Sequence, residues 1–238
     1  MVINETYAIE VENLAISYFS FERGNSISLG KYKEIEALKE INLKISPGES
    51  VAILGKNGAG KTTLLQAISG SLRPKYGRIQ TNGKVFTLRG SNPGLIPHLT
   101  PRQNVRLLAP VYGVSKDKLK DFEDEVEKFC ELGEAYDRRY KTLSSGMAGR
   151  VGFGFTTSLS PEILLMDETL GVGDENFRKK ATKKSEEFMK RGETLLLSTH
   201  SLNLAKSMCM RGIVLDAGQI VFDGKSSEAV EFYLKISK

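Results

Sequence analysis

The chain has 238 residues, which is long enough for one large domain or two small ones with a buried core. It carries 34 Lys and Arg against 29 Asp and Glu, a formal net charge of +5 with no long basic run, so an ordinary soluble protein is favoured over a nucleic-acid binder. The N-terminus has no basic stretch followed by an apolar one, and no apolar run approaches the roughly eighteen residues of a membrane span, which predicts a soluble, cytoplasmic protein.

The first third of the chain predicts strands separated by turns. Residues 9–18 alternate loosely and indicate a strand, the polar, glycine-containing residues 21–34 indicate a loop or insertion, and residues 36–45 resume the strand pattern. Residues 51–54, "VAIL", form the short, wholly apolar run typical of a strand buried on both faces. A helix is expected from about 60 to 69, and residues 77–88 predict a hairpin around "TNGK".

From Pro101 the pattern becomes helical, with Thr100 as the expected cap. Helices are expected over 116–132 and 145–158, followed by a strand over 163–166, a helix over about 175–190, a strand over 194–198 and a helix from 201. Two closing strands meet at "DAGQ", and a helix over 226–237 follows. Strands that alternate with helices predict an α/β fold with a mostly parallel sheet, in one domain over 1–238 with a helical subdomain inserted at about 100–160. Cys130 and Cys209 are expected to be free, buried thiols.

The stretch "GKNGAGKT", residues 55–62, fits the phosphate-loop pattern between an expected strand and an expected helix. Its glycines let the backbone N–H groups point inward at phosphate oxygens, and the helix N-terminus adds partial positive charge. Lys61 is expected to reach the β- and γ-phosphates, and Thr62 to bind Mg²⁺. The alternative is a chance glycine-rich turn. The expected nucleotide contacts are Gly55, Lys56, Asn57, Gly58, Ala59, Gly60, Lys61, Thr62 and Thr63.

Two adjacent carboxylates, Asp167 and Glu168, follow the apolar run "ILLM". Two acids at a surface turn usually carry no function. In a phosphate-loop protein, however, a carboxylate at the end of a neighbouring strand holds the metal ion, which suits Asp167. Glu168 is then placed to act as the general base that activates water against the γ-phosphate.

The stretch "LSSGM", residues 143–147, resembles the LSGGQ signature of ABC-type ATPases. It stands between the phosphate loop and the acidic pair, and His200 follows the next apolar run, so the resemblance covers nearly the whole chain. The resemblance implies an antiparallel β subdomain, ATP and Mg²⁺ as cofactors, and Glu168, His200 and Lys61 as catalytic residues. It also implies that Tyr18 stacks on adenine, that Asp174 of the turn "GVGD" faces the dimer partner, and that the γ-phosphate of the partner's nucleotide contacts Ser144, Ser145 and Gly146.

At three places the sequence departs from the general pattern of ABC-type ATPases, and these departures indicate a subgroup of the family. Ser91 stands near the place of the usual glutamine, which makes it a weaker candidate ligand of Mg²⁺; Ser145 and Met147 replace Gly and Gln, and "DETLGVGD" replaces "DEPTSGLD". Together with "RVGFGF" and the tail "FDGKSSEAVEFY", these features resemble the ATPase subunits of polysaccharide ABC exporters, the Wzt, KpsT and TagH group.

This resemblance implies a homodimer, docked by a polytopic permease at the cytoplasmic face of the inner membrane, that exports a lipid-linked polysaccharide and binds no nucleic acid. O-antigen is the first candidate cargo, and capsule and teichoic acid are alternatives. Two other classes stay open: a soluble ABC ATPase without transport, and a scaffold that only binds nucleotide. Members with a C-terminal carbohydrate-binding domain are much longer than this chain, which either lacks that domain or is a truncated form.

The segment 21–34 is either a solvated loop or a contact with the membrane subunit, because it carries Phe21, Ile27, Leu29 and Tyr32.

Overall fold

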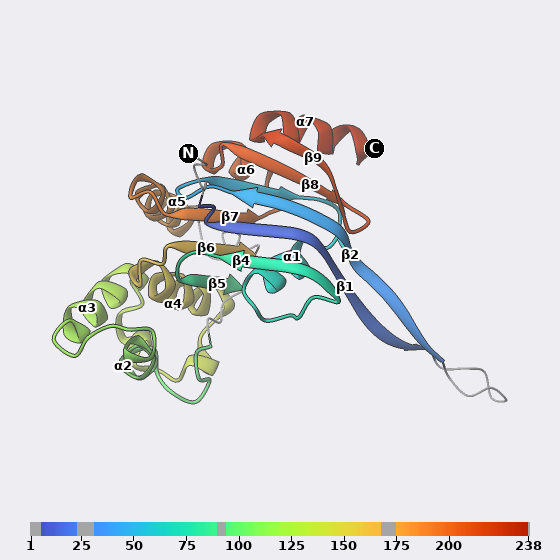
Figure 1. The fold of residues 1–238 in the computed structure, drawn as a ribbon. Coiled ribbons are helices and arrows are strands. Elements are labelled where there is room, and N and C mark those ends of the chain that lie inside the picture. The colour runs from blue at the N-terminus through green and yellow to red at the C-terminus, as the bar shows by residue number, and fades with distance from the viewer. Residues whose placement is uncertain (1–5, 23–30, 90–93, 168–174, 238) are drawn as a thin grey trace. The chain divides into compact units, whose positions relative to one another are not determined.

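The computed structural model of the chain describes residues 6–22, 31–89, 94–167 and 175–237 (Figure 1). The chain divides into two compact units, each described by itself below. The first unit is formed by residues 1–83 with 196–238, and the second by residues 84–195. Strand β7 (Thr194–Ser198) contains the second boundary, and all five of its residues are buried.

The first unit contains an antiparallel sheet of order β2-β1-β4, made of β1 (Ile9–Glu22), β2 (Lys31–Ile45) and β4 (Tyr76–Thr81). The pairing of β1 with β4 ends at Ala15, whereas β1 and β2 stay paired from Ile9 with Ile45 to Glu22 with Lys31. The outer halves of β1 and β2 therefore continue as a two-stranded ribbon (Figure 1).

The predicted loop over 21–34 is wrong at both of its ends. Phe21 lies opposite Tyr32 in the ribbon, with the two ring centroids 5.2 Å apart in an edge-to-face arrangement. Cross-strand backbone hydrogen bonds and this ring pair favour extended structure in spite of the polar composition. Residues 23–30 lie outside the described part of the chain.

The remainder of the first unit packs helices on a second group of strands. Strand β3 (Ser50–Leu54) pairs in parallel with β8 (Arg211–Asp216), which pairs antiparallel with β9 (Gln219–Lys225). The helices are α1 (Lys61–Ile68), α6 (Leu202–Met208) and α7 (Ser226–Ile236). Every residue of β3 is buried, which confirms the strand that its apolar run predicts.

The predicted hairpin over 77–88 is wrong, because its two strands have different partners. Strand β4 pairs with β1, whereas β5 (Val85–Arg89) pairs in parallel with β6 (Ile163–Asp167). Asn82, the expected turn residue, donates its backbone N–H to the carbonyl of Ala8 and its side-chain amide to the carbonyl of Tyr7. These bonds extend the pairing with β1 and do not close a turn on β5.

The second unit is mainly helical. Its helices are α2 (Pro101–Val111), α3 (Leu119–Cys130), α4 (Ser145–Ser158) and α5 (Glu175–Lys190), with 3₁₀ turns over Gly133–Asp137 and Tyr140–Thr142. The predicted cap is confirmed: Thr100 and Gln103 form a reciprocal capping box at the start of α2. Helix α3 begins three residues later than the sequence predicts, at Leu119.

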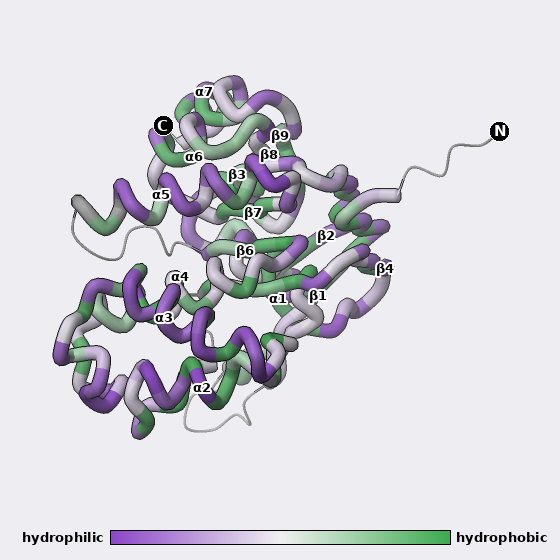
Figure 2. Tube along the Cα trace, turned by 90° about the vertical axis from the view of Figure 1, so that its left-hand side faces the viewer, coloured by the Kyte–Doolittle hydropathy of each residue, from purple (hydrophilic) through white to green (hydrophobic). Residues whose placement is uncertain are grey.

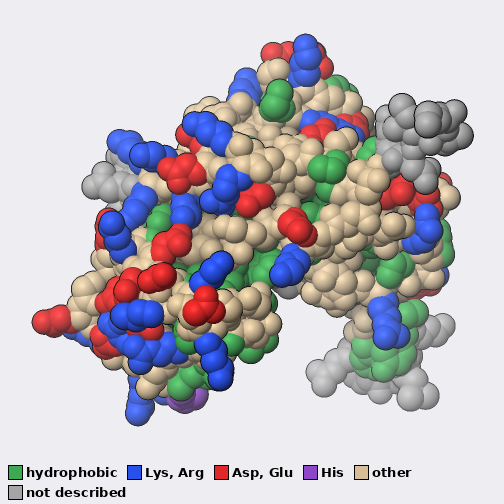
Figure 3. Space-filling model, turned by 60° about the vertical axis from the view of Figure 1, so that its left-hand side comes forward, with side chains coloured by type: hydrophobic (Ala, Val, Ile, Leu, Met, Phe, Trp, Pro, Cys, Tyr) green, Lys and Arg blue, Asp and Glu red, His purple; other side chains and the backbone are tan. Residues whose placement is uncertain are grey.

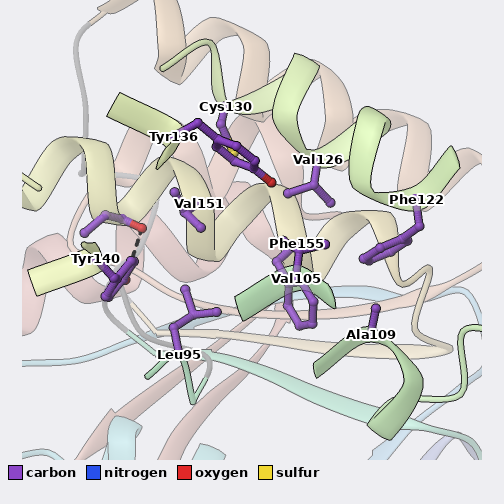
Figure 4. Close-up of a cluster of buried hydrophobic side chains, with 11 residues drawn as sticks. Leu95, Val105, Ala109, Phe122, Val126, Cys130, Tyr136, Tyr140, Val151 and Phe155 are labelled. Carbon is purple, nitrogen blue, oxygen red and sulfur yellow. Dashed lines mark hydrogen bonds between the residues drawn. The ribbon is translucent and has the colours of Figure 1, made fainter. Parts of the chain in front are cut away.

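A core of apolar side chains from α2, α3 and α4 holds these helices together (Figure 4). The hydropathy of the chain follows this packing, since α2 and α3 alternate between polar and apolar residues at a helical period (Figure 2). At the edge of the core, Arg102 of α2 donates hydrogen bonds to Glu123 and Glu127 of α3 and to Asp137. Cys130 and Cys209 are free and buried, as predicted.

On the molecular face in Figure 3, basic and acidic side chains are interspersed. None of the described helices is long and apolar enough to cross a bilayer. The architecture is α/β: an antiparallel sheet, parallel strand pairs and helices of two units.

Candidate nucleotide-binding site

The phosphate loop, residues 55–62, leaves the buried strand β3 and leads directly into α1. Gly60 is the N-cap residue of α1 and has a φ of 106°. A Cβ there would lie 2.8 Å from both the carbonyl oxygen of Ala37 and a methyl of Leu38, so only glycine fits. Because glycine has no side chain, it cannot cap the helix. The first N–H groups of α1 are therefore suited to bind an anion.

Lys61 holds the loop in this shape. Its side chain is buried, and its ammonium group donates hydrogen bonds to the carbonyls of Gly55, at 2.8 Å, and Lys56, at 3.1 Å. The positive charge thus lies inside the curve of the loop, where phosphate oxygens would find a charge-assisted donor.

A turn late in the chain supports the loop from outside. Between β8 and β9, Ala217 and Gly218 have φ values of 46° and 84°. The N–H of Gly218 donates to the carbonyl of Ala59, and the N–H of Lys39 donates to the carbonyl of Gly218. The sequence predicts the turn at "DAGQ" but not this support, because the contact partners are far apart in the chain. Gly218 is the one feature of the sequence from which a close contact at this turn could have been predicted.

Tyr18 lies on β1 beside the start of α1. Its hydroxyl group is 3.3 Å from the Thr63 hydroxyl and donates a hydrogen bond to it, while 40% of the residue stays exposed. Ile35, the cross-strand neighbour of Tyr18, is also exposed. The ring is therefore tied to the phosphate-loop helix and has free surface for a planar ligand.

His200 follows β7 in a short turn. The N–H of Thr199 donates to the carbonyl of Ile53 at 3.5 Å, which places this turn next to the end of β3, where the phosphate loop begins. The N–H of Ser201 donates to the Thr199 hydroxyl, and the Ser201 hydroxyl accepts from the N–H of Leu204 and caps α6. The first unit thus brings together the phosphate loop, Tyr18, Thr63 and the turn that carries His200.

The second unit carries two further groups of predicted residues. Asp167 is the last residue of β6, is partly exposed, and lies opposite Arg89 in the parallel register. Ser144 is the N-cap of α4 and its hydroxyl accepts from the N–H of Met147 at 3.2 Å. Ser145 and Gly146 form the first turn of α4, and both Ser144 and Ser145 are exposed.

Three of the predicted site residues, Ser91, Glu168 and Asp174, lie outside the described part of the chain. Among the described residues there is no group of three or more His, Cys, Asp or Glu side chains that could hold a metal ion by itself.

A buried strand, a glycine-rich loop and an uncapped helix start, with an aromatic residue and a histidine beside them, define a phosphate-loop nucleotide-binding protein. The family comparison agrees with this class, because residues 38–171 match the ABC transporter family. The matched segment is more than half of the 238 residues, and the chain belongs to this family.

Several curated relatives are named as ATP-binding proteins of export systems. The O-antigen export system ATP-binding protein RfbB of Myxococcus xanthus is 38% identical over 84% of this chain, and the teichoic acids export ATP-binding protein TagH of Lactococcus lactis is 38% identical over 85%. RfbB of Klebsiella pneumoniae is 32% identical over 90% of this chain and is covered over 87% of its own length. The chain spans less than half of the first two relatives, at 46% and 43%.

Solved structures share the fold. An ATP-binding cassette solved as a dimer in a post-hydrolysis state, bound to ADP and Pi, superposes with a TM-score of 0.77, is 26% identical, and covers 92% of this chain and 98% of its own. An ATP-binding subunit of an ABC transporter superposes with a TM-score of 0.79 over 98% of this chain and 100% of its own, at 24% identity, and supports the fold alone.

Proposed function

We propose that this chain is the ATP-hydrolysing subunit of an ABC transporter that exports a lipid-linked polysaccharide, with O-antigen as the first candidate cargo. The observation that carries the proposal is the phosphate loop with its inward Lys61, in a chain about 38% identical to two export ATP-binding proteins. Capsule and teichoic acid are the alternative cargoes, and the name of the TagH relative favours the latter.

Different residues of the chain have different roles in ATP binding and hydrolysis. The N–H groups at the start of α1 and the Lys61 ammonium bind the phosphates, and Tyr18 offers its ring to adenine. Glu168 accepts the proton of the attacking water, and His200, in the turn beside β3, contacts the γ-phosphate. Bond cleavage then releases ADP and phosphate.

The donor set suits Mg²⁺. Thr62 lies in the first turn of α1 and offers a hydroxyl oxygen, and Asp167 offers a carboxylate at a partly exposed strand end. Magnesium is usually held by one or two carboxylates together with phosphate oxygens and water. When bound, the ion neutralises charge that develops on the phosphates. Thr62 and Asp167 would hold it, with Ser91 as a third candidate.

Two copies of the chain would complete the site. The first turn of α4, with the exposed Ser144 and Ser145, presents N–H groups and hydroxyls to the nucleotide of the second copy. Asp174 would face that copy across the dimer interface. The related cassette solved in a post-hydrolysis state is dimeric, which supports a dimer.

The protein would act at a membrane, attached to a partner subunit. The chain forms one nucleotide-binding domain with a helical subdomain at about 100–160, attached to a polytopic permease at the cytoplasmic face of the inner membrane. The outer ribbon, defined as residues 19–22 and 31–35 of β1 and β2, is the candidate contact with the permease. Its aromatic side chains Phe19, Phe21 and Tyr32 are 72%, 53% and 75% exposed.

The test combines an assay for ATP hydrolysis with affinity purification from detergent-extracted membranes. We expect ATP-dependent phosphate release and co-purification of a polytopic protein, and cells that lack the chain should retain unexported, lipid-linked polysaccharide. Hydrolysis without any membrane partner would contradict transport and support a soluble ABC ATPase. Nucleotide binding without hydrolysis would instead support a scaffold.

A further inference from the structure

Three aromatic rings from three helices of the second unit meet in one buried cluster. Phe129 of α3, Phe153 of α4 and Phe177 of α5 form this aromatic triad, with centroid distances of 5.6 Å for Phe129 to Phe153, 5.6 Å for Phe129 to Phe177, and 6.1 Å for Phe153 to Phe177. All three side chains are buried. The edge-to-face geometry of the two pairs that include Phe177 is the arrangement that aromatic quadrupoles prefer.

Two cations fix the orientation of the triad. The guanidinium of Arg150, on α4, lies 5.1 Å from the centre of the Phe177 ring, and the ammonium of Lys180, on α5, lies 4.9 Å from the centre of the Phe129 ring. The same ammonium donates to the carbonyl of Phe129 at 2.9 Å and to the carboxylate of Glu131 at 2.6 Å, so that it caps the C-terminus of α3.

The contact between α3 and α4 is close. A Cβ at Gly154 would lie 2.9 Å from a ring carbon of Phe129 and 3.2 Å from the sulfur of Cys130. Helix α4 therefore has little freedom to move against α3 without shifting the Phe129 ring. Because Phe177 packs on both Phe129 and Phe153, a shift of α4 also acts on the first turn of α5.

Helices α4 and α5, which pack together here, both begin next to residues proposed to act in ATP hydrolysis. Helix α4 starts at Ser145, in the signature, and Arg150 lies five residues further on. Helix α5 starts at Glu175, directly after Asp174 and a few residues after Glu168, the proposed base. We propose that Phe177 is a positioning residue that couples the signature helix α4 to the first turn of α5. Engagement of α4 by the nucleotide of a second copy then sets the rate of hydrolysis. This inference depends on the proposed function.

The test compares two matched substitutions in the full-length protein, Phe177→Leu and Phe188→Leu. Both remove a buried ring from α5, and Phe188 has a cation of its own, since the Arg191 guanidinium lies 5.8 Å from its centroid. We expect similar losses of melting temperature. For Phe177→Leu alone we expect kcat to fall about tenfold and the Hill coefficient for ATP to fall toward one, while the Kd for ATP changes less than about twofold.

Two further variants keep the test decisive if Phe177→Leu does not fold. Phe177→Tyr retains the ring and should restore cooperativity, and Arg150→Met removes the charge over that ring but keeps the length of the side chain. Arg150→Met alone should lower kcat and the Hill coefficient in the same direction as Phe177→Leu, because Arg150 contacts the Phe177 ring.

Equal kcat values and Hill coefficients for Phe177→Leu and Phe188→Leu would overturn the inference, as would a wild-type kcat and Hill coefficient in Arg150→Met. A wild-type protein without ATP hydrolysis would contradict the proposed function instead, so the two failures are distinguishable.

Discussion

At the scale of single residues, the position of the Lys61 ammonium group bears most directly on nucleotide binding. Its ammonium donates to the carbonyls of Gly55 and Lys56 and is held inside the phosphate loop. We expect Lys61→Ala to weaken ATP binding by about tenfold to a few hundredfold, because it removes a charge-assisted hydrogen bond to phosphate. Titration calorimetry with ATP measures the change.

The matched control for this prediction is Lys206→Ala, which removes the same charge from an exposed position on α6. The control should bind ATP like the wild type. If Lys61→Ala kept the wild-type affinity, the assignment of residues 55–62 as the phosphate loop would be wrong.

Some site residues could be predicted from the sequence and others could not, for a physical reason. The phosphate loop depends on glycines and a lysine at short spacing, which the sequence displays directly. The support by Gly218 and the bond from Thr199 to Ile53 join residues that are distant in the chain. A single sequence does not encode such pairings locally, so they were missed.

At the scale of elements, one arginine joins α2, α3 and the first 3₁₀ turn. Arg102 bonds to Glu123, whose side chain is only 2% exposed, and to Glu127 and Asp137. Arg102→Met should lower the free energy of unfolding by about 1.5–3 kcal/mol, since it removes charge-assisted hydrogen bonds to three carboxylates, while Arg106 still pairs with Glu123. Urea denaturation measures the loss. Arg106→Met is the control and should cost less, because Arg106 also bonds Glu123 but is half exposed.

The same network predicts a dependence on pH. The hydrogen bond from Arg102 lowers the pKa of Asp137 below its ordinary value of 3.8. Burial raises the pKa of Glu123, but hydrogen bonds from Arg106 and Arg102 outweigh it and bring the pKa below 4.5. A lowered pKa means that the ionised forms stabilise the fold at neutral pH and that this contribution is lost in acid. The difference between wild type and Arg102→Met should therefore shrink as the pH falls below these values. A constant difference would contradict the ionic origin.

The outer ribbon supports a prediction about the membrane partner. Phe19 and Tyr32 are mostly exposed, so Phe19→Ser combined with Tyr32→Ser should leave ATP hydrolysis unchanged and should lower the melting temperature only slightly, through the lost ring contact of Tyr32 with Phe21. Export of polysaccharide in cells should fall severalfold if the ribbon contacts the permease. The control is Met210→Ser with Val221→Ser, at exposed apolar positions elsewhere. Full export by the ribbon variant would return this segment to the role of a solvated strand pair.

Elements with strong local signals were predicted well. Helix α4 has the predicted bounds, residues 145–158, because Ser144 provides a cap and the following residues repeat at helical spacing. The failures concern strand pairing. A turn signal at "TNGK" indicates a hairpin only if the two strands have no better partners, and here both have them in β1 and β6. Pairing of strands is decided by distant segments, which local patterns do not report.

At the scale of the whole molecule, the predicted cycle of ATP-driven dimerisation can be arrested. We expect Glu168→Gln to reduce turnover by about a hundredfold or more, since an amide cannot accept the proton of the attacking water. ATP binding should persist, because the phosphate loop is unchanged. Light scattering after size exclusion should then detect a dimer with ATP and monomers without it.

The comparison for this variant is Glu186→Gln, a change of the same kind at an exposed position on α5. It should hydrolyse ATP like the wild type. Wild-type turnover by Glu168→Gln would show that another group is the base.

The turn at Gly218 has a consequence for biosynthesis. The phosphate loop leaves the ribosome early, whereas the turn that donates to Ala59 and the strand β8 that pairs with β3 are translated much later. A nascent chain therefore displays the whole nucleotide-binding motif while the backbone contacts that hold it in shape are still missing. A product that ends before β8 would carry the motif without these backbone contacts. Such a fragment should be retained less on an ATP column than the chain that contains β8 and the Gly218 turn.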